Sequence, residues 1–118
     1  MSHNCPACLV TCEDFRLHRR AGGPSLVEAV LADWVGGDCD LVTRGGAAQD
    51  LVRGGPGVAD SLLRDVRTSV ELHRADTVFL LHHADCGAYR AFGFADAAAE
   101  RAQHAADLRA AAERLRVE

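Results

Sequence analysis

Cysteine and histidine side chains of the kind that bind metal ions follow two separate apolar runs of the sequence. Cys12 ends the first run, and His83 and Cys86 come just after another run much farther along the chain. Two thiolates and one imidazole are good ligands for Zn²⁺, and three protein ligands leave a fourth position open for water, as in catalytic zinc sites. Water bound there becomes a source of hydroxide near neutral pH. These residues predict a zinc site; a closed structural site, with Asp14 as fourth ligand, is the alternative.

A carboxylate and a guanidinium follow Cys12 closely. Asp14 stands two residues after Cys12, and Arg16 stands two residues after Asp14. An Asp–Arg pair holds the carboxylate ionised and can aim it at a water molecule on the metal. The pair is therefore a candidate catalytic dyad. A cap at the end of a strand with a simple ion pair is the alternative interpretation.

Short apolar runs that contain β-branched residues indicate the strands that would position these side chains. They lie at residues 7–12, 39–43 and 77–81. Strands that alternate with helices pair in parallel through right-handed crossovers, and the reactive residues of such a sheet gather at the carboxyl ends of its strands. We therefore expect the metal-binding residues to meet at one edge of a sheet covered on both faces. Arg44 follows the second strand and is expected at the same edge, in the pocket or as a surface charge.

Helical periodicity and composition predict three helices. The first follows Pro24 and stops at residues 36–37, which are both glycine, and the second covers about 57–74. The third covers about 95–117, where Ala, Arg and Glu dominate. This last helix has few large apolar residues, so we expect it to be half exposed or in contact with a partner. The chain is thus predicted to form one α/β domain over residues 1–118, with a short parallel sheet and flanking helices.

Composition places the chain among small globular proteins. It has 118 residues, of which 48% are hydrophobic, and a formal net charge of −4, which suits one domain with a modest core. No apolar stretch approaches the roughly 20 residues that a membrane-spanning helix needs, and an acidic chain without a basic stripe is not expected to bind nucleic acid. Five cysteines without an N-terminal export signal predict a reducing compartment, the cytoplasm.

Two of these motifs together resemble the signature of the β-class carbonic anhydrases. That family has C-x-D-x-R after its first strand and H-x-x-C-G after its third, and here residues 12–16 are CEDFR and residues 83–87 are HADCG. Residues 41–47 resemble a degenerate form of the family's second-strand motif. The resemblance covers about residues 7–92, in the same order and at similar separations.

The resemblance implies a three-layer α/β sandwich and a zinc-dependent lyase that hydrates carbon dioxide to bicarbonate as a homodimer. It implies that Cys12, His83 and Cys86 bind zinc and that Asp14 and Arg16 form the catalytic dyad. In some members of the family the aspartate takes the fourth zinc position at rest, which makes Asp14 a candidate fourth ligand. Related enzymes on this fold hydrolyse carbonyl sulfide or carbon disulfide. A zinc-stabilised binding module without turnover is a further alternative.

The remaining cysteines and histidines have less specific interpretations. Cys5 and Cys8 form a C-x-x-C that precedes a strand, so we interpret them as incidental thiols; a redox pair, or a weak metal site with His3, are the alternatives. His82 is expected to point away from the face of its neighbouring ligand, although it could face the pocket and shuttle protons. Three other histidines are expected to be solvated: His18, His73 and His104. Candidates for the apolar wall of a substrate pocket are Phe15, Phe79 and Tyr89.

Overall fold

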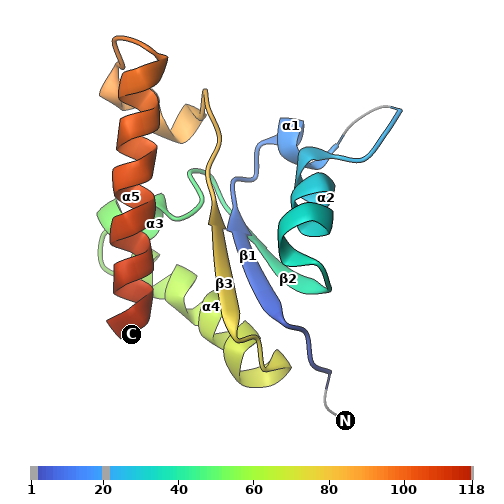
Figure 1. Ribbon diagram of the computed structural model, residues 1–118. Helices are drawn as coiled ribbons and strands as arrows, with labels where there is room; N and C mark the ends of the chain where they lie inside the picture. The colour runs from blue at the N-terminus through green and yellow to red at the C-terminus, as the bar shows by residue number, and fades with distance from the viewer. Residues whose placement is uncertain (1–2, 20–21, 118) are drawn as a thin grey trace.

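A parallel sheet of three strands forms the centre of the protein, whose computed structural model describes residues 3–19 and 22–117. The strands are β1 (Ala7–Thr11), β2 (Cys39–Thr43) and β3 (Thr77–Leu81), in the order β2-β1-β3 (Figure 1). Both neighbours pair with β1 in parallel along its whole length. All of β1 is buried, because it lies between the other two strands and the flanking elements cover its side chains. The predicted parallel α/β fold is confirmed.

The strand order places a crevice beside the central strand. The connection from β1 to β2 and the connection from β2 to β3 leave in opposite directions, so right-handed crossovers put their helices on opposite faces. Figure 1 shows this arrangement: α4 (Val58–His73) passes behind the sheet, and α2 (Leu26–Val30) lies on the other side. In such sheets the crevice opens at the carboxyl ends of the two strands where the order reverses, here β1 and β3.

The helix predicted after Pro24 is correct in place and differs in detail. It begins at Leu26, where the Ser25 hydroxyl accepts a hydrogen bond from the Glu28 N–H, and its last part, η1 (Leu31–Val35), is π-helical. Gly36 ends it in the left-handed conformation that glycine adopts without strain. The side chain of Trp34, in the π-helical part, is exposed.

The second predicted helix agrees closely with α4. Leu62 and Val66 of its apolar stripe are buried, whereas Val58 and Val70 at the two ends remain exposed. Long α5 (Ala97–Val117) confirms the third helix, and it packs on α3 (Gln49–Arg53) beside the sheet.

Sequence patterns missed three one- or two-turn helices. They are α1 (Phe15–His18), α3, and a 3₁₀ helix, η2 (Gly87–Phe92). A single turn contains too few residues to show the 3.6-residue periodicity from which helices are predicted. Two of the three directly follow residues of the metal-binding motifs, so these motifs lie at strand-to-helix turns.

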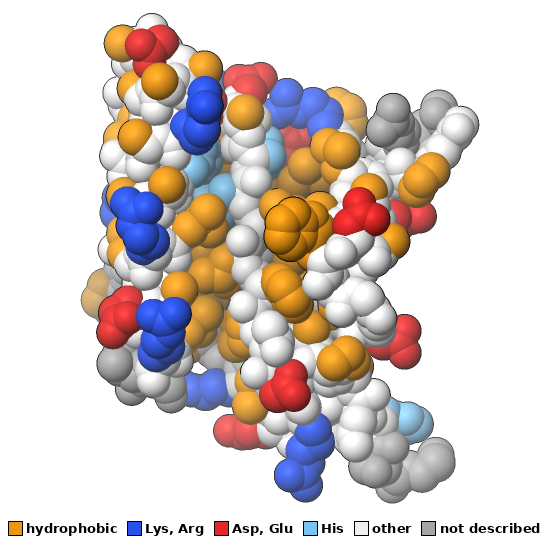
Figure 2. Space-filling model, in the orientation of Figure 1, with side chains coloured by type: hydrophobic (Ala, Val, Ile, Leu, Met, Phe, Trp, Pro, Cys, Tyr) orange, Lys and Arg blue, Asp and Glu red, His pale blue; other side chains and the backbone are white. Residues whose placement is uncertain are grey.

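The expectation of a sheet covered on both faces is wrong for the outer strands. Residues of β2 and β3 are only partly buried, and Leu41 is exposed. Figure 2 shows hydrophobic side chains open to view between α5 and α2. In the described part of the chain, the helices that flank the three strands leave part of this apolar face uncovered. The homodimer stays a prediction. None of the helices in the described part of the chain is long and apolar enough to cross a membrane.

Candidate metal centre

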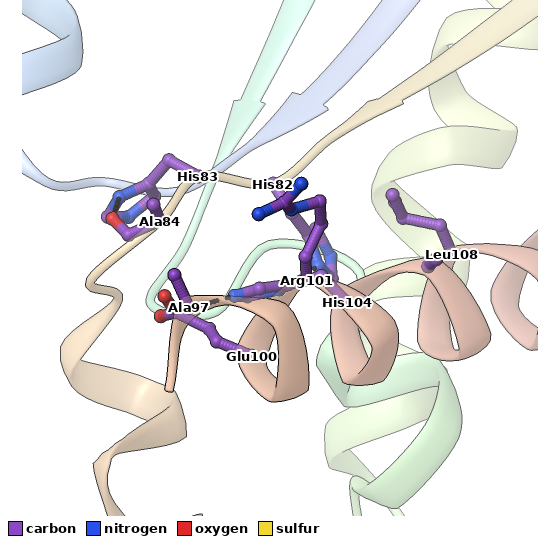
Figure 3. A pocket seen from close by; sticks show the side chains of 9 residues that line it. His82, His83, Ala84, Ala97, Glu100, Arg101, His104 and Leu108 are labelled. Atoms are coloured by element: carbon purple, nitrogen blue, oxygen red, sulfur yellow. Dashed lines mark hydrogen bonds and ion pairs between the residues drawn. The ribbon is translucent and has the colours of Figure 1, made fainter. Parts of the chain in front are cut away.

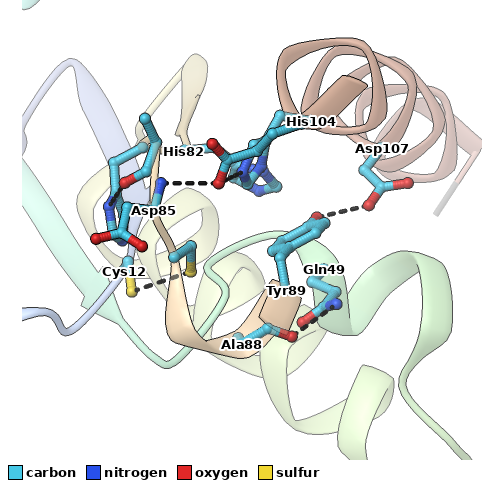
Figure 4. A network of polar contacts seen from close by, with 12 residues as sticks. Cys12, Gln49, His82, Asp85, Ala88, Tyr89, His104 and Asp107 are labelled. Carbon is cyan, nitrogen blue, oxygen red and sulfur yellow. Dashed lines mark hydrogen bonds and ion pairs between the residues drawn. The ribbon is translucent and has the colours of Figure 1, made fainter. Parts of the chain in front are cut away.

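The three predicted zinc ligands meet at the carboxyl edge of the sheet. Cys12 follows β1, and His83 and Cys86 follow β3, so the two strands beside the crevice deliver them. One ligand atom of each residue lies within 4.8 Å of the others. The Sγ atoms of Cys12 and Cys86 are 3.9 Å apart (Figure 4). Two sulfurs bound to one Zn²⁺ at about 2.3 Å in tetrahedral geometry would be about 3.8 Å apart, so this separation fits a shared ion.

The imidazole of His83 has a nitrogen in the state that a metal requires. Its Nδ1 lies 2.8 Å from the Ala84 carbonyl oxygen; because a carbonyl only accepts, Nδ1 carries the proton in this bond. Nε2 is then a lone-pair acceptor, and it is buried without a hydrogen-bond partner. An unpartnered buried polar atom is costly, and native proteins rarely contain one. A Zn²⁺ ion beside the two sulfurs would satisfy this nitrogen, so the residues present fit the ion; that they bind zinc stays a prediction.

Two opposing effects act on the pKa of the Cys86 thiol. Burial raises the pKa of its thiol, while hydrogen bonds from the backbone N–H groups of Ala88 and Gly46 oppose this effect. A metal must displace the thiol proton to bind. The N–H groups then stabilise the negative sulfur, as neighbouring hydrogen-bond donors do for thiolate ligands elsewhere.

Asp14 and Arg16 form a close pair next to this cluster. Arg16 Nη2 lies 2.6 Å from Asp14 Oδ2, its Nε contacts both carboxylate oxygens, and its backbone N–H donates to Oδ1 at 2.8 Å. The last bond caps α1. These hydrogen bonds from Arg16 hold the pKa of Asp14 well below its usual range. Asp14 is paired with Arg16 and is not in the group of close ligand atoms; its role as a fourth ligand stays a prediction.

Arg16 also connects the two halves of the site. Its Nη1 donates to the Asp85 carboxylate at 3.1 Å and its Nη2 to the Asp85 carbonyl at 2.9 Å. Asp85 stands between His83 and Cys86 in a left-handed conformation (φ +56°). Its backbone N–H donates to Glu100 Oε2 at 2.7 Å, from the first turn of α5. The metal-binding turn is therefore held from both sides.

The sequence of the chain is similar to that of one protein family. A family model described as "Putative carbonic anhydrase" matches residues 2–117. The chain belongs to this family. No curated protein and no solved structure matches it. The resemblance inferred from the two motifs is therefore confirmed by a match over nearly the whole chain.

A buried polar network lies behind the metal-binding residues of this carbonic anhydrase family member. The Ala48 N–H donates to His82 Nε2 at 3.2 Å, which leaves His82 Nδ1 to donate to His104 Nδ1 at 3.0 Å (Figure 4). The Tyr89 hydroxyl donates to Asp107 at 2.5 Å, and Arg53 pairs with the same carboxylate. These contacts join the end of β3 and η2 to α5.

The network corrects the prediction for His104. His104 was expected at the surface, but it is only 7% exposed, because α5 turns it toward His82. Burial lowers the pKa of His82 to about 4, so it is neutral at neutral pH. Figure 3 shows His82 directed toward α5 and His83 directed to the other side, as the alternation of a strand requires.

Two further histidines differ from expectation. His18 was predicted to be solvated, but it is half buried, and its Nε2 lies 2.7 Å from the Cys12 carbonyl oxygen. His73 is also half buried and contacts Asp40. The contact of His18 with Cys12 spans six residues and depends on the short turn of α1 between them. Asp40 is 33 residues from His73 in the sequence, so local spacing contains no signal for their contact. Glu100 was missed for the same reason.

A cavity of about 390 Å³ lies between the end of β3 and α5 (Figure 3). Its apolar walls include Ala84, Ala97 and Leu108, and the polar residues that line it are His82, His83, Glu100, Arg101 and His104. The aromatic residues expected in a substrate pocket do not line it. Phe15 is exposed, Phe79 lies by a different hollow, and Tyr89 is buried with its hydroxyl toward Asp107.

Arg44 has a structural environment of its own. Its guanidinium pairs with Asp50 and Asp65 and donates to the Ser61 hydroxyl. Its backbone pairs with Thr11 and Glu13, on either side of Cys12. Of the two roles considered for Arg44, the structure places its side chain with α3 and α4 and not among the metal-binding residues.

Glu100→Ala is expected to weaken metal binding by about 10-fold or more while the fold is retained, because residues that orient metal ligands typically contribute this much. Without Glu100, the strained Asp85 loses the bond that fixes its N–H. Competition with a chelator measures the zinc affinity. Glu113→Ala is the matched control, since Glu113 pairs with Arg116 on the exposed part of the same helix. Equal affinities for the two variants would contradict this role.

Proposed function

We propose that the protein is a cytoplasmic, zinc-dependent enzyme that hydrates carbon dioxide to bicarbonate. The observation that supports this most is the buried, unpartnered Nε2 of His83 next to two thiols at a spacing suited to one Zn²⁺. Membership of the carbonic anhydrase family supports the same conclusion. The Asp14–Arg16 pair adjoins this cluster, as an enzyme of this type needs.

Cys12, His83 and Cys86 hold the metal in this proposal, and zinc supplies a polarised water molecule as the nucleophile. Asp14 accepts a hydrogen bond from that water and so fixes its orientation toward the carbon of the substrate. Because hydrogen bonds from Arg16 keep the pKa of Asp14 low, its carboxylate is a poor store for the proton. The proton therefore leaves to buffer, and Asp14 acts by orientation.

The substrate must be small, linear and uncharged to enter an apolar space beside the metal. The cavity next to His83 has apolar walls that include Ala84 and Leu108, which suit such a molecule, and Glu100 and Arg101 are among its polar lining residues. An excess of carbon dioxide over bicarbonate drives net turnover in the direction of hydration by mass action.

Stopped-flow measurement of carbon dioxide hydration tests the proposal. The zinc-loaded protein is expected to accelerate hydration, and the zinc-free protein is expected to give the uncatalysed rate. Carbonyl sulfide and carbon disulfide are tested in parallel under the same conditions. A zinc-loaded protein that is no faster than the zinc-free protein overturns the proposed activity. Faster hydrolysis of either sulfur compound than hydration of carbon dioxide overturns the proposed substrate.

Activity is expected to be weak near pH 7 and to rise through pH 8 to 9. Two thiolates neutralise the charge of a divalent ion, so water bound there should lose its proton at a higher pH than the ~7 of a three-histidine site. Initial rates at constant ionic strength, with zinc content determined at each pH, measure the profile. A flat profile from pH 6.5 to 9 in fully metallated enzyme contradicts this electrostatic account.

A further inference from the structure

A second group of metal-binding side chains lies at the opposite edge of the sheet. Ligand atoms of Cys5, Asp40 and His73 all lie within 4.8 Å of one another. Cys5 precedes β1, Asp40 belongs to β2, and His73 is the last residue of α4. Seven residues of extended chain span roughly 20 Å, so Cys5 and Cys12 lie at opposite ends of β1 and cannot share an ion.

Interpreting Cys5 as half of a redox pair does not fit the structure. Cys8, the other cysteine of the C-x-x-C, is fully buried inside the central strand, where burial raises the pKa of its thiol to about 11. A redox pair needs an accessible thiol of low pKa. His3, which was considered as a partner in a metal site, is exposed and is not among the clustered residues. Cys5 therefore belongs with Asp40 and His73.

Hydrogen bonds hold this group in place before any ion binds. The backbone N–H of Cys5 donates to the His73 carbonyl at 2.9 Å, which fixes the N-terminal segment against the end of α4. The Ser69 hydroxyl donates to Asp40 Oδ2 at 2.6 Å. The same carboxylate oxygen lies 2.7 Å from His73 Nδ1 and 3.7 Å from Cys5 Sγ. A nitrogen and a sulfur therefore converge on one carboxylate oxygen whose position a third residue fixes.

We propose that Cys5, Asp40 and His73 form a second, independent site for a divalent cation of the zinc class. A thiolate, an imidazole and a carboxylate together suit Zn²⁺ better than Mg²⁺ or Ca²⁺, which prefer oxygen ligands alone. Binding releases the proton of the Cys5 thiol, and a neutral His73 binds the ion through Nδ1 when its ring proton is on Nε2. Ser69 keeps its bond to the carboxylate and orients it, as residues around metal ligands commonly do.

The site is open to solvent, unlike the cluster around Cys12. The side chains of His73 and Asp40 are 40% and 31% exposed, so an ion can enter directly and keep water in its remaining position. An ion here would join the N-terminal segment, β2 and the end of α4. Because the unfolded chain lacks this arrangement, binding stabilises the folded state. Binding of a cation at this site does not require that the protein hydrates carbon dioxide.

Zinc stoichiometry and thermal unfolding test the proposal. The wild-type protein is expected to bind two zinc ions per chain, and Cys5→Ser and His73→Ala one each. The unfolding temperature of the wild type should rise further with added zinc than that of either variant. His3→Ala is the control and should keep both ions, since His3 adjoins the site in sequence but is not one of its proposed ligands.

The two sites are separated by a second set of variants. Cys12→Ser with Cys86→Ser should keep one zinc ion, and adding Cys5→Ser should remove it. With Co²⁺ in place of zinc, the double variant should keep a thiolate charge-transfer band that the triple variant lacks. If Cys5→Ser and His73→Ala, each folded as judged by thermal unfolding without metal, bind as much zinc as the wild type, the second site is wrong. If the wild type binds a single zinc ion, which Cys5→Ser removes and the Cys12→Ser/Cys86→Ser variant keeps, only the proposed catalytic centre is contradicted.

Discussion

Cys86→Ser is expected to lose the zinc ion at the carboxyl edge of the sheet and to reduce carbon dioxide hydration to the uncatalysed rate. A serine hydroxyl is a far weaker zinc ligand than a thiolate. The substitution also breaks the 3.9 Å pair of sulfurs with Cys12 and leaves His83 Nε2 buried without a partner. Metal analysis of the purified protein and stopped-flow assays measure the two effects.

The control for this variant is Cys39→Ser. Cys39 is a half-buried cysteine of β2 that belongs to neither cluster of metal-binding residues among those the structure describes. Its replacement should leave both zinc content at the carboxyl edge and hydration unchanged. Full retention of metal and activity in both Cys12→Ser and Cys86→Ser would remove the proposed centre.

The strands and the position of the site could be predicted from the sequence because both depend on local patterns. The apolar runs that become β1, β2 and β3 are bounded by charged residues or glycine, and alternation with helices requires parallel pairing. Parallel strands place Cys12 and His83 at the same edge whatever their order. The geometry of the cluster therefore follows from topology, and long-range contacts did not have to be known.

The residues that support the site could not be predicted in this way. Glu100 and His104 reach it from α5, whose sequence is nearly uniform in Ala, Arg and Glu and shows no distinct polar face. Their role depends on how α5 packs on α3, a contact between elements that are distant in sequence. His73 likewise looks like an ordinary residue at the end of a helix until the fold brings Asp40 beside it.

The negative charge of Asp14 is expected to contribute to turnover. Asp14→Asn is expected to keep zinc and the fold but to reduce carbon dioxide turnover by roughly 100-fold or more, the usual contribution of a group that orients or activates a nucleophile. Asparagine caps helices as well as aspartate does, so Oδ1 can still accept the Arg16 N–H that begins α1. The variant therefore removes the charge while it preserves the local structure.

Asp85→Asn is the matched control for this charge. Asp85 is the other carboxylate paired with Arg16, but its side chain is 90% exposed, and asparagine tolerates the left-handed conformation that Asp85 adopts. Turnover should change little in this variant. Equal losses in the two variants would assign the effect to the ion-pair network around Arg16 and contradict a specific role for Asp14.

The pH profile distinguishes orientation by Asp14 from proton transfer to it. Because Arg16 holds the pKa of Asp14 well below its usual range, Asp14 is ionised throughout pH 6.5 to 9 and does not titrate there. Asp14→Asn should therefore lower the rate at every pH by a similar factor and leave the rise between pH 7 and 9 in place. A variant whose rate no longer rises with pH would show that Asp14 itself takes up the proton, and the orienting role would be wrong.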